Sequence, residues 1–183
     1  MRVAVHAGQL LQPVPGGIGR YVRSLLDALP SAGVTPVPFA AGSLPGAVDL
    51  GWPRGGLRYE AWHRLRRPVV RVEGDLVHAT SLAVPPARGR PLVVTVHDLV
   101  FLRQPEHLTA RGVAFHRRGL ELARRDAAAI VVPTAFGRDD LVREGFDPSM
   151  LSDPIFFLDP AKGAYERLTP ARYADIAEGR VKL

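Results

Sequence analysis

Short apolar stretches alternate with amphipathic helical stretches along most of this chain, and this alternation constrains its fold more than any other feature. Three segments have the pattern of short buried strands: Arg2–Ala7, Asp75–Ala79 and Leu92–His97. Apolar residues at helical spacing cover Gly17–Leu29 and Thr109–Arg125. We therefore predict an α/β fold, in which a parallel sheet carries helices on both faces.

The segments between these elements fit the same plan. Residues 34–39 form a further strand pattern, whose two prolines favour a place at the sheet edge because proline cannot donate to a ladder. Residues 40–68 are rich in glycine and proline around one short helix. Ala129–Pro133 is another strand, and Thr134 is placed to cap the helix that follows it.

A glycine-rich turn precedes the first predicted helix. Gly16, Gly17 and Gly19 lead directly into an amphipathic pattern. Glycine lets backbone N–H groups approach a ligand closely, and the helix dipole leaves partial positive charge at this end, so the turn suits an anion. The alternative is that the glycines serve only a tight turn.

Polar side chains follow several of the predicted strands where each strand ends. Thr80 and Ser81 follow one strand, His97 and Asp98 end and follow the next, and Thr134 follows a third. In a parallel sheet these positions share the carboxyl edge, where ligands bind in such folds. We therefore predict one binding rim there, although a single histidine at a strand end also serves as a structural hydrogen-bonding group.

Composition narrows the class of protein and its partners. The chain has 183 residues, a net charge of +6, 23% charged residues, no cysteine, and no apolar run long enough to span a bilayer. Lack of disulfides and thiolate sites favours a cytoplasmic protein.

The densest basic cluster, Arg58–Pro68, sets Leu57, Trp62 and Leu65 roughly along one helical face. It is either a surface helix whose Trp62 packs on the core, or a peripheral contact for acidic lipid or phosphate at the inner membrane face. No nucleic-acid-binding motif accompanies it, so nucleic acid is not an expected partner.

Four motifs in order carry a family resemblance. They are "GGIGRYVRSLLDAL", "DLVHATS", "VVTVHDLVFLRQPEH" and "AIVVPTAFGRDDLVREGF". Together they resemble the N-terminal, acceptor-side half of a glycosyltransferase of family 4, over residues 1–148. The resemblance implies a Rossmann-like domain that is one half of a GT-B fold. It also implies transfer of a sugar from a nucleotide-sugar donor to a glycosyl acceptor, with retention of configuration and without metal or other cofactor.

The resemblance also implies roles for particular residues. Gly16 and Gly17 would face the donor phosphates, and Arg20 either adds charge near a phosphate or lies on the surface. His97 would hydrogen-bond the donor sugar or the reacting centre, and Asp98 would orient the loop or the acceptor. The leaving phosphate would assist deprotonation of the acceptor, so that no protein nucleophile is expected, and stabilisation of the departing diphosphate would carry much of the catalysis.

Residues 149–183 depart from the family pattern, which continues into a donor-binding domain. In this segment we expect a last strand over Ile155–Leu158 and a short helix over 171–178, bracketed by Thr169 and Gly179. Two functions stay open. The chain is either a glycosyltransferase that a second chain or self-association completes, or a non-catalytic module that binds a phosphorylated or sugar ligand.

Overall fold

The computed structural model describes residues 1–152, together with the backbone of residues 156–159 and 164–167. Six strands form one sheet, in the order β3-β2-β1-β4-β5-β6, with every neighbouring pair parallel. Their bounds are β1 Arg2–His6, β2 Thr35–Ala40, β3 Val48–Asp49, β4 Leu76–Ala79, β5 Leu92–Thr95 and β6 Ala129–Val131. The predicted α/β fold with a parallel sheet is confirmed.

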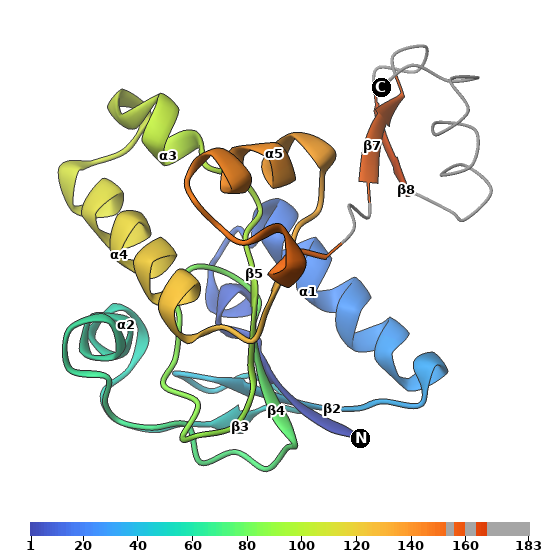
Figure 1. The fold of residues 1–183 in the computed structure, drawn as a ribbon. Helices are drawn as coiled ribbons and strands as arrows, with labels where there is room; N and C mark the ends of the chain where they lie inside the picture. Colours follow the sequence, from blue (N-terminus) through green and yellow to red (C-terminus); the bar gives the residue numbers. More distant parts are fainter. Residues whose placement is uncertain (153–155, 160–163, 168–183) are drawn as a thin grey trace.

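Helices cover both faces of this sheet (Figure 1). They are α1 Gly16–Ala28, α2 Gly55–Leu65, α3 Val100–Arg103, α4 Ala110–Asp126 and α5 Ala135–Arg143, with short 3-10 turns at Gly8–Leu11, Leu29–Ala32, Pro105–His107 and Pro148–Met150. The connection from β1 through α1 to β2 runs one way across the sheet, and that from β5 through α4 to β6 runs the other. Right-handed crossovers therefore place α1 on one face and α4 on the opposite one.

Strand β2 differs from its predicted place at the sheet edge, because β3 lies outside it. The two strands pair only through Phe39 and Ala40. Pro36 and Pro38 precede this short pairing, and on their other side they align with β1. The prolines are thus accommodated next to an edge strand that stops short of them.

The predicted capping residue of the last helix is confirmed, and α4 starts in the same way. The Thr134 hydroxyl accepts a hydrogen bond from the Gly137 amide over 3.1 Å, and the Thr109 hydroxyl accepts one from Gly112 over the same distance. Each bond satisfies one of the amides that a helix leaves unpaired at its start.

The core between the sheet and α2 is aromatic. The buried His6 ring stacks on Phe39 at 5.4 Å between centroids and meets the edges of Tyr59 and Trp62. Neither ring nitrogen of His6 has a hydrogen-bond partner in the described part of the chain, and burial lowers its pKa to about 4. His6 therefore acts as a neutral aromatic side chain near pH 7.

The basic cluster Arg58–Pro68 divides into structural and exposed side chains. Trp62 is fully buried, which confirms the prediction that it packs on the core. Leu57 and Leu65 are 58% and 70% exposed and do not share its face. Arg58 is buried and donates to the carbonyls of Leu50, Gly51 and Pro53. Much of the charge that suggested a binding surface in the sequence thus bonds to the protein's own backbone.

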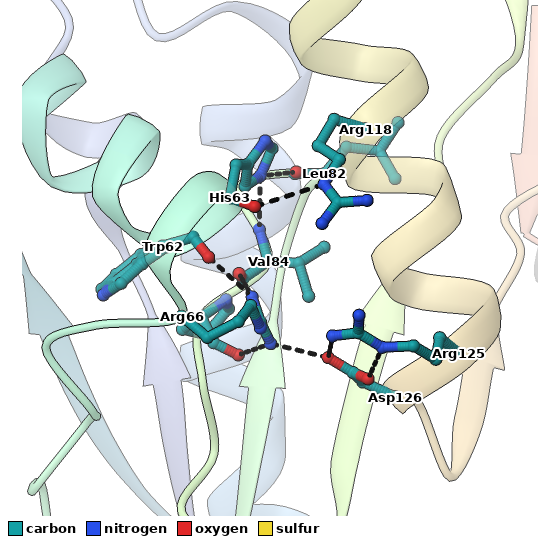
Figure 2. A network of polar contacts seen from close by, with 9 residues as sticks. Trp62, His63, Arg66, Leu82, Val84, Arg118, Arg125 and Asp126 are labelled. Atoms are coloured by element: carbon teal, nitrogen blue, oxygen red, sulfur yellow. Dashed lines mark hydrogen bonds and ion pairs between the residues drawn. The ribbon is translucent and has the colours of Figure 1, made fainter.

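Arg66 and Asp126 join α2 to α4 (Figure 2). The Arg66 guanidinium donates to the carbonyls of Trp62, Val84 and Pro85 and forms an ion pair with Asp126 at 2.8 Å. On the other side Asp126 also pairs with Arg125. Arg118 of α4 donates to the His63 carbonyl, and His63 Nε2 lies 3.0 Å from Leu82 O. This network fixes both helices on residues 82–85, which follow β4.

Strand β7, Phe156–Asp159, overlaps the strand that the sequence predicted at Ile155–Leu158. It pairs antiparallel with β8, Ala164–Arg167, in a separate two-stranded sheet and does not extend the main one. Instead, Leu151 forms a parallel bridge to Ile130 of β6. The predicted helix over 171–178, with Thr169 and Gly179, lies outside the described residues.

Candidate functional site

His97 is the best-placed polar side chain at the carboxyl edge of the sheet. Its Nε2 lies 2.9 Å from the carbonyl oxygen of Thr80, which can only accept, so Nε2 carries the proton and Nδ1 carries the lone pair. Burial lowers the pKa of His97, while the Thr80 bond and the Asp98 charge act in the opposite direction. The ring is therefore neutral near pH 7, and no residue of the range 1–152 donates a hydrogen bond to the lone pair at Nδ1.

A hollow of about 310 Å³ opens beside His97. The polar part of its wall consists of Ser81, Thr95, His97, Asp98 and His116, and the apolar part of Ile18, Leu82, Val100, Phe101 and Leu108. The structure thus brings three sequence-predicted residues, Ser81, His97 and Asp98, into the wall of one hollow. Parallel strands explain this meeting, since their carboxyl ends share one edge.

Thr80 contributes to the site through its backbone. Its buried hydroxyl donates to the His6 carbonyl at 2.6 Å, while its own carbonyl orients His97. Asp98 is exposed, and its Oδ1 accepts from the Val100 amide at 3.1 Å, which starts α3. No residue of the described range 1–152 bonds to the second carboxylate oxygen of Asp98, which leaves it for a ligand.

A buried hydrogen-bonded chain supports His97, and sequence reasoning missed it. The Thr95 hydroxyl lies 2.9 Å from the Tyr21 hydroxyl and 2.8 Å from His78 Nε2. The Tyr21 ring meets the His97 ring edge-on, with centroids 5.0 Å apart. Burial, assisted by the His97 charge, lowers the pKa of His78 to about 4. The sequence signal that could have predicted this contact is the period of two along a strand, which places Thr95 and His97 on the same side.

His116 was also missed, because nothing near it in the sequence marks it as a site residue. It lies on α4, whose Gly119 approaches the segment after β4 so closely that an added Cβ would lie 2.3 Å from the Leu82 carbonyl oxygen. That close approach sets the preceding turn of α4, with His116, against the hollow.

The glycine turn begins α1 beside this hollow, since Ile18 lines it. Gly16 has φ +63°, which favours glycine, and the space around Gly16 and Gly17 is open. Gly19 is buried, and an added Cβ there would meet Pro15 Cβ at 2.2 Å. Gly16 and Gly19 thus have structural reasons to be glycine, whereas neither backbone angle nor space requires glycine at 17.

Arg20 and Thr134 lie on two different helices. Arg20 is exposed on the first turns of α1, and no ion pair engages it in the described part of the chain. Thr134 caps α5, whose next turn reaches the His97 backbone: a Cβ on Gly137 would lie 3.9 Å from His97 O. The start of α5 therefore adjoins the backbone of His97.

Two kinds of feature are absent from the described residues. No three histidine or acidic side chains gather there in a way that would hold a metal ion. In the same residues, none of the helices has the length and apolar character needed to cross a membrane.

Sequence comparison assigns the family. The model of Glycosyltransferase Family 4 matches residues 15–152, which is more than half of the chain. The chain therefore belongs to glycosyltransferase family 4, as its motifs predicted.

A solved structure has the same fold. Alr3699/HepE of Anabaena, in complex with UDP-glucose, superimposes with a TM-score of 0.50 at 18% identity, over 83% of this chain and 43% of its own. The same protein with UDP and glucose gives a TM-score of 0.48 at 20% identity, with the same coverage. This chain thus spans less than half the length of that protein.

A short stretch matches a different class of protein. Long-chain fatty acid transport protein 3 of Mus musculus, and its counterpart in Homo sapiens, are 51% identical over 43 residues. These residues are 24% of this chain and 6% of either relative. So short a match carries no functional conclusion for the chain.

Proposed function

We propose that this chain serves the transfer of a sugar from a nucleotide-sugar donor to a hydroxyl of a glycosyl acceptor. The observation that carries the proposal is the neutral His97, which presents a free Nδ1 lone pair at a hollow beside the start of α1. Membership of glycosyltransferase family 4 supports the reaction class.

At the reacting centre, His97 and Asp98 act as hydrogen-bond acceptors. Nδ1 of His97 receives a hydrogen bond from a hydroxyl of the donor sugar, and the free oxygen of Asp98 receives one from a hydroxyl of the acceptor. The Ser81 hydroxyl is placed in the same wall for a further bond. Thr80 acts through its carbonyl, which holds the His97 ring.

On the donor side, the start of α1 faces the phosphates. The first helical hydrogen bond runs from the Gly19 amide to the Pro15 carbonyl, so the amides of Gly16, Gly17 and Ile18 lie outside the helix's own bonding. Such amides, at the positive end of a helix of 13 residues, bind phosphate oxygens well. Arg20 adds a cation one turn further, and Thr134 keeps the start of α5 beside this rim.

Transfer with retention needs no protein nucleophile in this proposal. The leaving phosphate oxygen takes the proton of the acceptor hydroxyl as the new glycosidic bond forms on the face from which the diphosphate departs. The α1 amides stabilise the negative charge on the diphosphate, which is the main protein contribution to the rate.

Binding without turnover is the second candidate, because this chain spans 43% of the HepE structure. Both candidates require the same carboxyl-edge site. They differ in whether nucleoside diphosphate is released in the presence of an acceptor. A glycosyltransferase releases it, alone or together with a second chain or a second copy, whereas a binding module does not.

A peripheral location fits the exposed surface of α2. Leu57 and Leu65 are exposed on α2, and Arg67, which follows the helix, is exposed and has no acidic partner in the described residues. This surface would contact acidic lipid headgroups. Co-sedimentation with vesicles that contain anionic lipid should retain the wild-type chain, and Leu65→Asn should weaken the association.

Amide shift mapping by NMR tests the proposal. Titration of ¹⁵N-labelled chain with UDP-glucose should shift the amides of Gly16, Gly17, His97 and Asp98, and leave those of Glu60 and Arg64 on α2 unchanged. Shifts confined to α2, or none at all, would contradict the site.

A further inference from the structure

The hollow beside His97 is more apolar than a site for a sugar ring alone requires. Five of the residues that line it are apolar: Ile18 of α1, Leu82, Val100 and Phe101 of α3, and Leu108. A ligand gains free energy in proportion to the apolar surface that it buries against such a wall. Its volume of about 310 Å³ is at the lower end of small-molecule sites, which span roughly 300–1,000 Å³.

Two imidazoles supply acceptors in this wall. His116 Nδ1 lies 2.7 Å from the Gly112 carbonyl oxygen, to which it donates, so the lone pair of the neutral ring is at Nε2. His97 is fixed in the opposite way, with its lone pair at Nδ1. Helix α4 thus holds one ring in place and the Thr80 carbonyl holds the other.

The polar part of the wall therefore favours ligand groups that donate hydrogen bonds and disfavours anionic groups. A negatively charged group in the hollow would lie near the Asp98 carboxylate in its wall, and the neutral His97 ring would offer it a lone pair at Nδ1 instead of a donor. Phosphates are better accommodated at the start of α1. A neutral, hydroxyl-bearing ligand with an apolar part satisfies both kinds of wall.

We propose that the hollow receives an amphiphilic acceptor, a sugar that carries an alkyl or aryl aglycone, and that His116 is a specificity-determining residue that accepts a hydrogen bond from it. This inference rests on the proposed function and names the class of its acceptor. The apolar aglycone lies against Ile18, Phe101 and Leu108, and a hydroxyl of the acceptor sugar reaches His116.

Alkyl glucosides of different length test this inference. Binding of methyl and hexyl β-D-glucopyranoside to the full chain would be measured by NMR, below micelle-forming concentrations. We expect hexyl glucoside to bind at least about tenfold more tightly, since each buried methylene strengthens binding several-fold. Leu108→Asn should remove this preference, and Val48→Asn, at an exposed position of the edge strand β3, should keep it. Equal affinities, or loss of the preference in Val48→Asn instead, would overturn the inference.

Two variants of His116 separate its hydrogen bond to the ligand from its place in the helix. Asparagine sets an amide near the position of Nδ1 and removes the group at Nε2, whereas glutamine reaches the position of Nε2. Binding of hexyl glucoside should fall about tenfold in His116→Asn and be largely retained in His116→Gln. An equal loss in both variants, or none in either, would overturn the role of His116.

Titration of the same sample with UDP-glucose separates this inference from the proposed function. Shifts at Gly17 and His97 without a preference for the longer alkyl chain would overturn the inference and leave the proposed function standing. A preference for the longer chain without nucleotide-induced shifts would support the apolar ligand class and overturn the proposed function.

Discussion

The Nε2 atom of His97 donates a hydrogen bond to the carbonyl oxygen of Thr80 over 2.9 Å, and this bond sets the proton on one side of the ring and the lone pair on the other. Because burial is the largest influence on it, the pKa of His97 lies below the ordinary value of 6.5. A ¹⁵N NMR titration should find the ring neutral at pH 7, as the Nε2–H tautomer.

The charge of Asp98 raises the pKa of His97 against the effect of burial. Asp98→Asn should therefore lower the pKa of His97 further, and Asp75→Asn, on the far end of the sheet before β4, should leave it unchanged. An upward shift in Asp98→Asn would mean that Asp98 does not act on His97 in this way.

Three neighbouring glycines should respond differently to alanine. Gly16→Ala should lower the free energy of unfolding by about 1–2 kcal/mol, because φ is +63° there. Gly19→Ala should also destabilise, because its Cβ would collide with Pro15. Gly17→Ala should be neutral or stabilise by up to about 1 kcal/mol, since alanine favours helix. Urea unfolding of the three variants measures this, and a large loss in Gly17→Ala would show an unrecognised structural role.

Thr134 and Thr109 cap two helices through equal hydrogen bonds, which makes them a matched pair. Alanine at either position should cost about 1 kcal/mol of stability. Aspartate at 134 caps as well as threonine, yet its charge should weaken binding of a nucleoside diphosphate at the nearby rim. Aspartate at 109 should leave that binding unchanged. Equal binding in both aspartate variants would remove Thr134 from the phosphate site.

Arg66 and Arg67 are adjacent arginines in different environments. Arg66 bonds three carbonyls and Asp126, whereas Arg67 is exposed. Arg66→Met should cost about 2 kcal/mol or more, because it leaves buried carbonyls unpaired, and Arg67→Met should change stability by no more than about 0.5 kcal/mol. Thermal unfolding of the two variants at one pH measures this difference in stability. Equal losses of stability in Arg66→Met and Arg67→Met would contradict the network of Figure 2.

The buried His6 makes stability depend on pH. Its pKa falls from 6.5 to about 4 on folding, so the unfolded chain binds more protons between these values. Stability present above pH 6.5 is lost as the pH falls towards about 4, by roughly 2 kcal/mol between pH 7 and pH 5 for this one group. His6→Leu should reduce the loss of stability over that interval. An unchanged pH dependence in the variant would show that His6 is not the group that titrates.

Most of the strands and helices could be predicted from the sequence because local periodicity records which side of each element is buried, but the short β3 and α3 were missed. Thr134 as a cap and the meeting of Ser81, His97 and Asp98 follow from the same reasoning. The surroundings of these residues could not be predicted, because they depend on contacts between distant segments. Tyr21 and His78 meet Thr95 across three elements, and His116 reaches the hollow because α4 comes close at Gly119.

The charge pattern alone could not predict which arginines are exposed, since a cluster of arginines looks the same in sequence whether it faces solvent or carbonyl groups. Arg58 is buried and Arg66 is half-buried, and both bond to main-chain oxygens that loops present. Nothing local in the sequence distinguishes them from the exposed Arg64 and Arg67.

Calorimetric titration of the chain with UDP-glucose tests the central claim most directly, with Gly17→Ala and His97→Ala as variants that keep the fold. We predict saturable binding to the wild type and binding weakened about tenfold or more in each variant, because one adds a methyl group among the phosphate-facing amides and the other removes the acceptor at Nδ1. Binding of equal strength in all three proteins, or none to the wild type, would contradict a donor site at the carboxyl edge of this sheet.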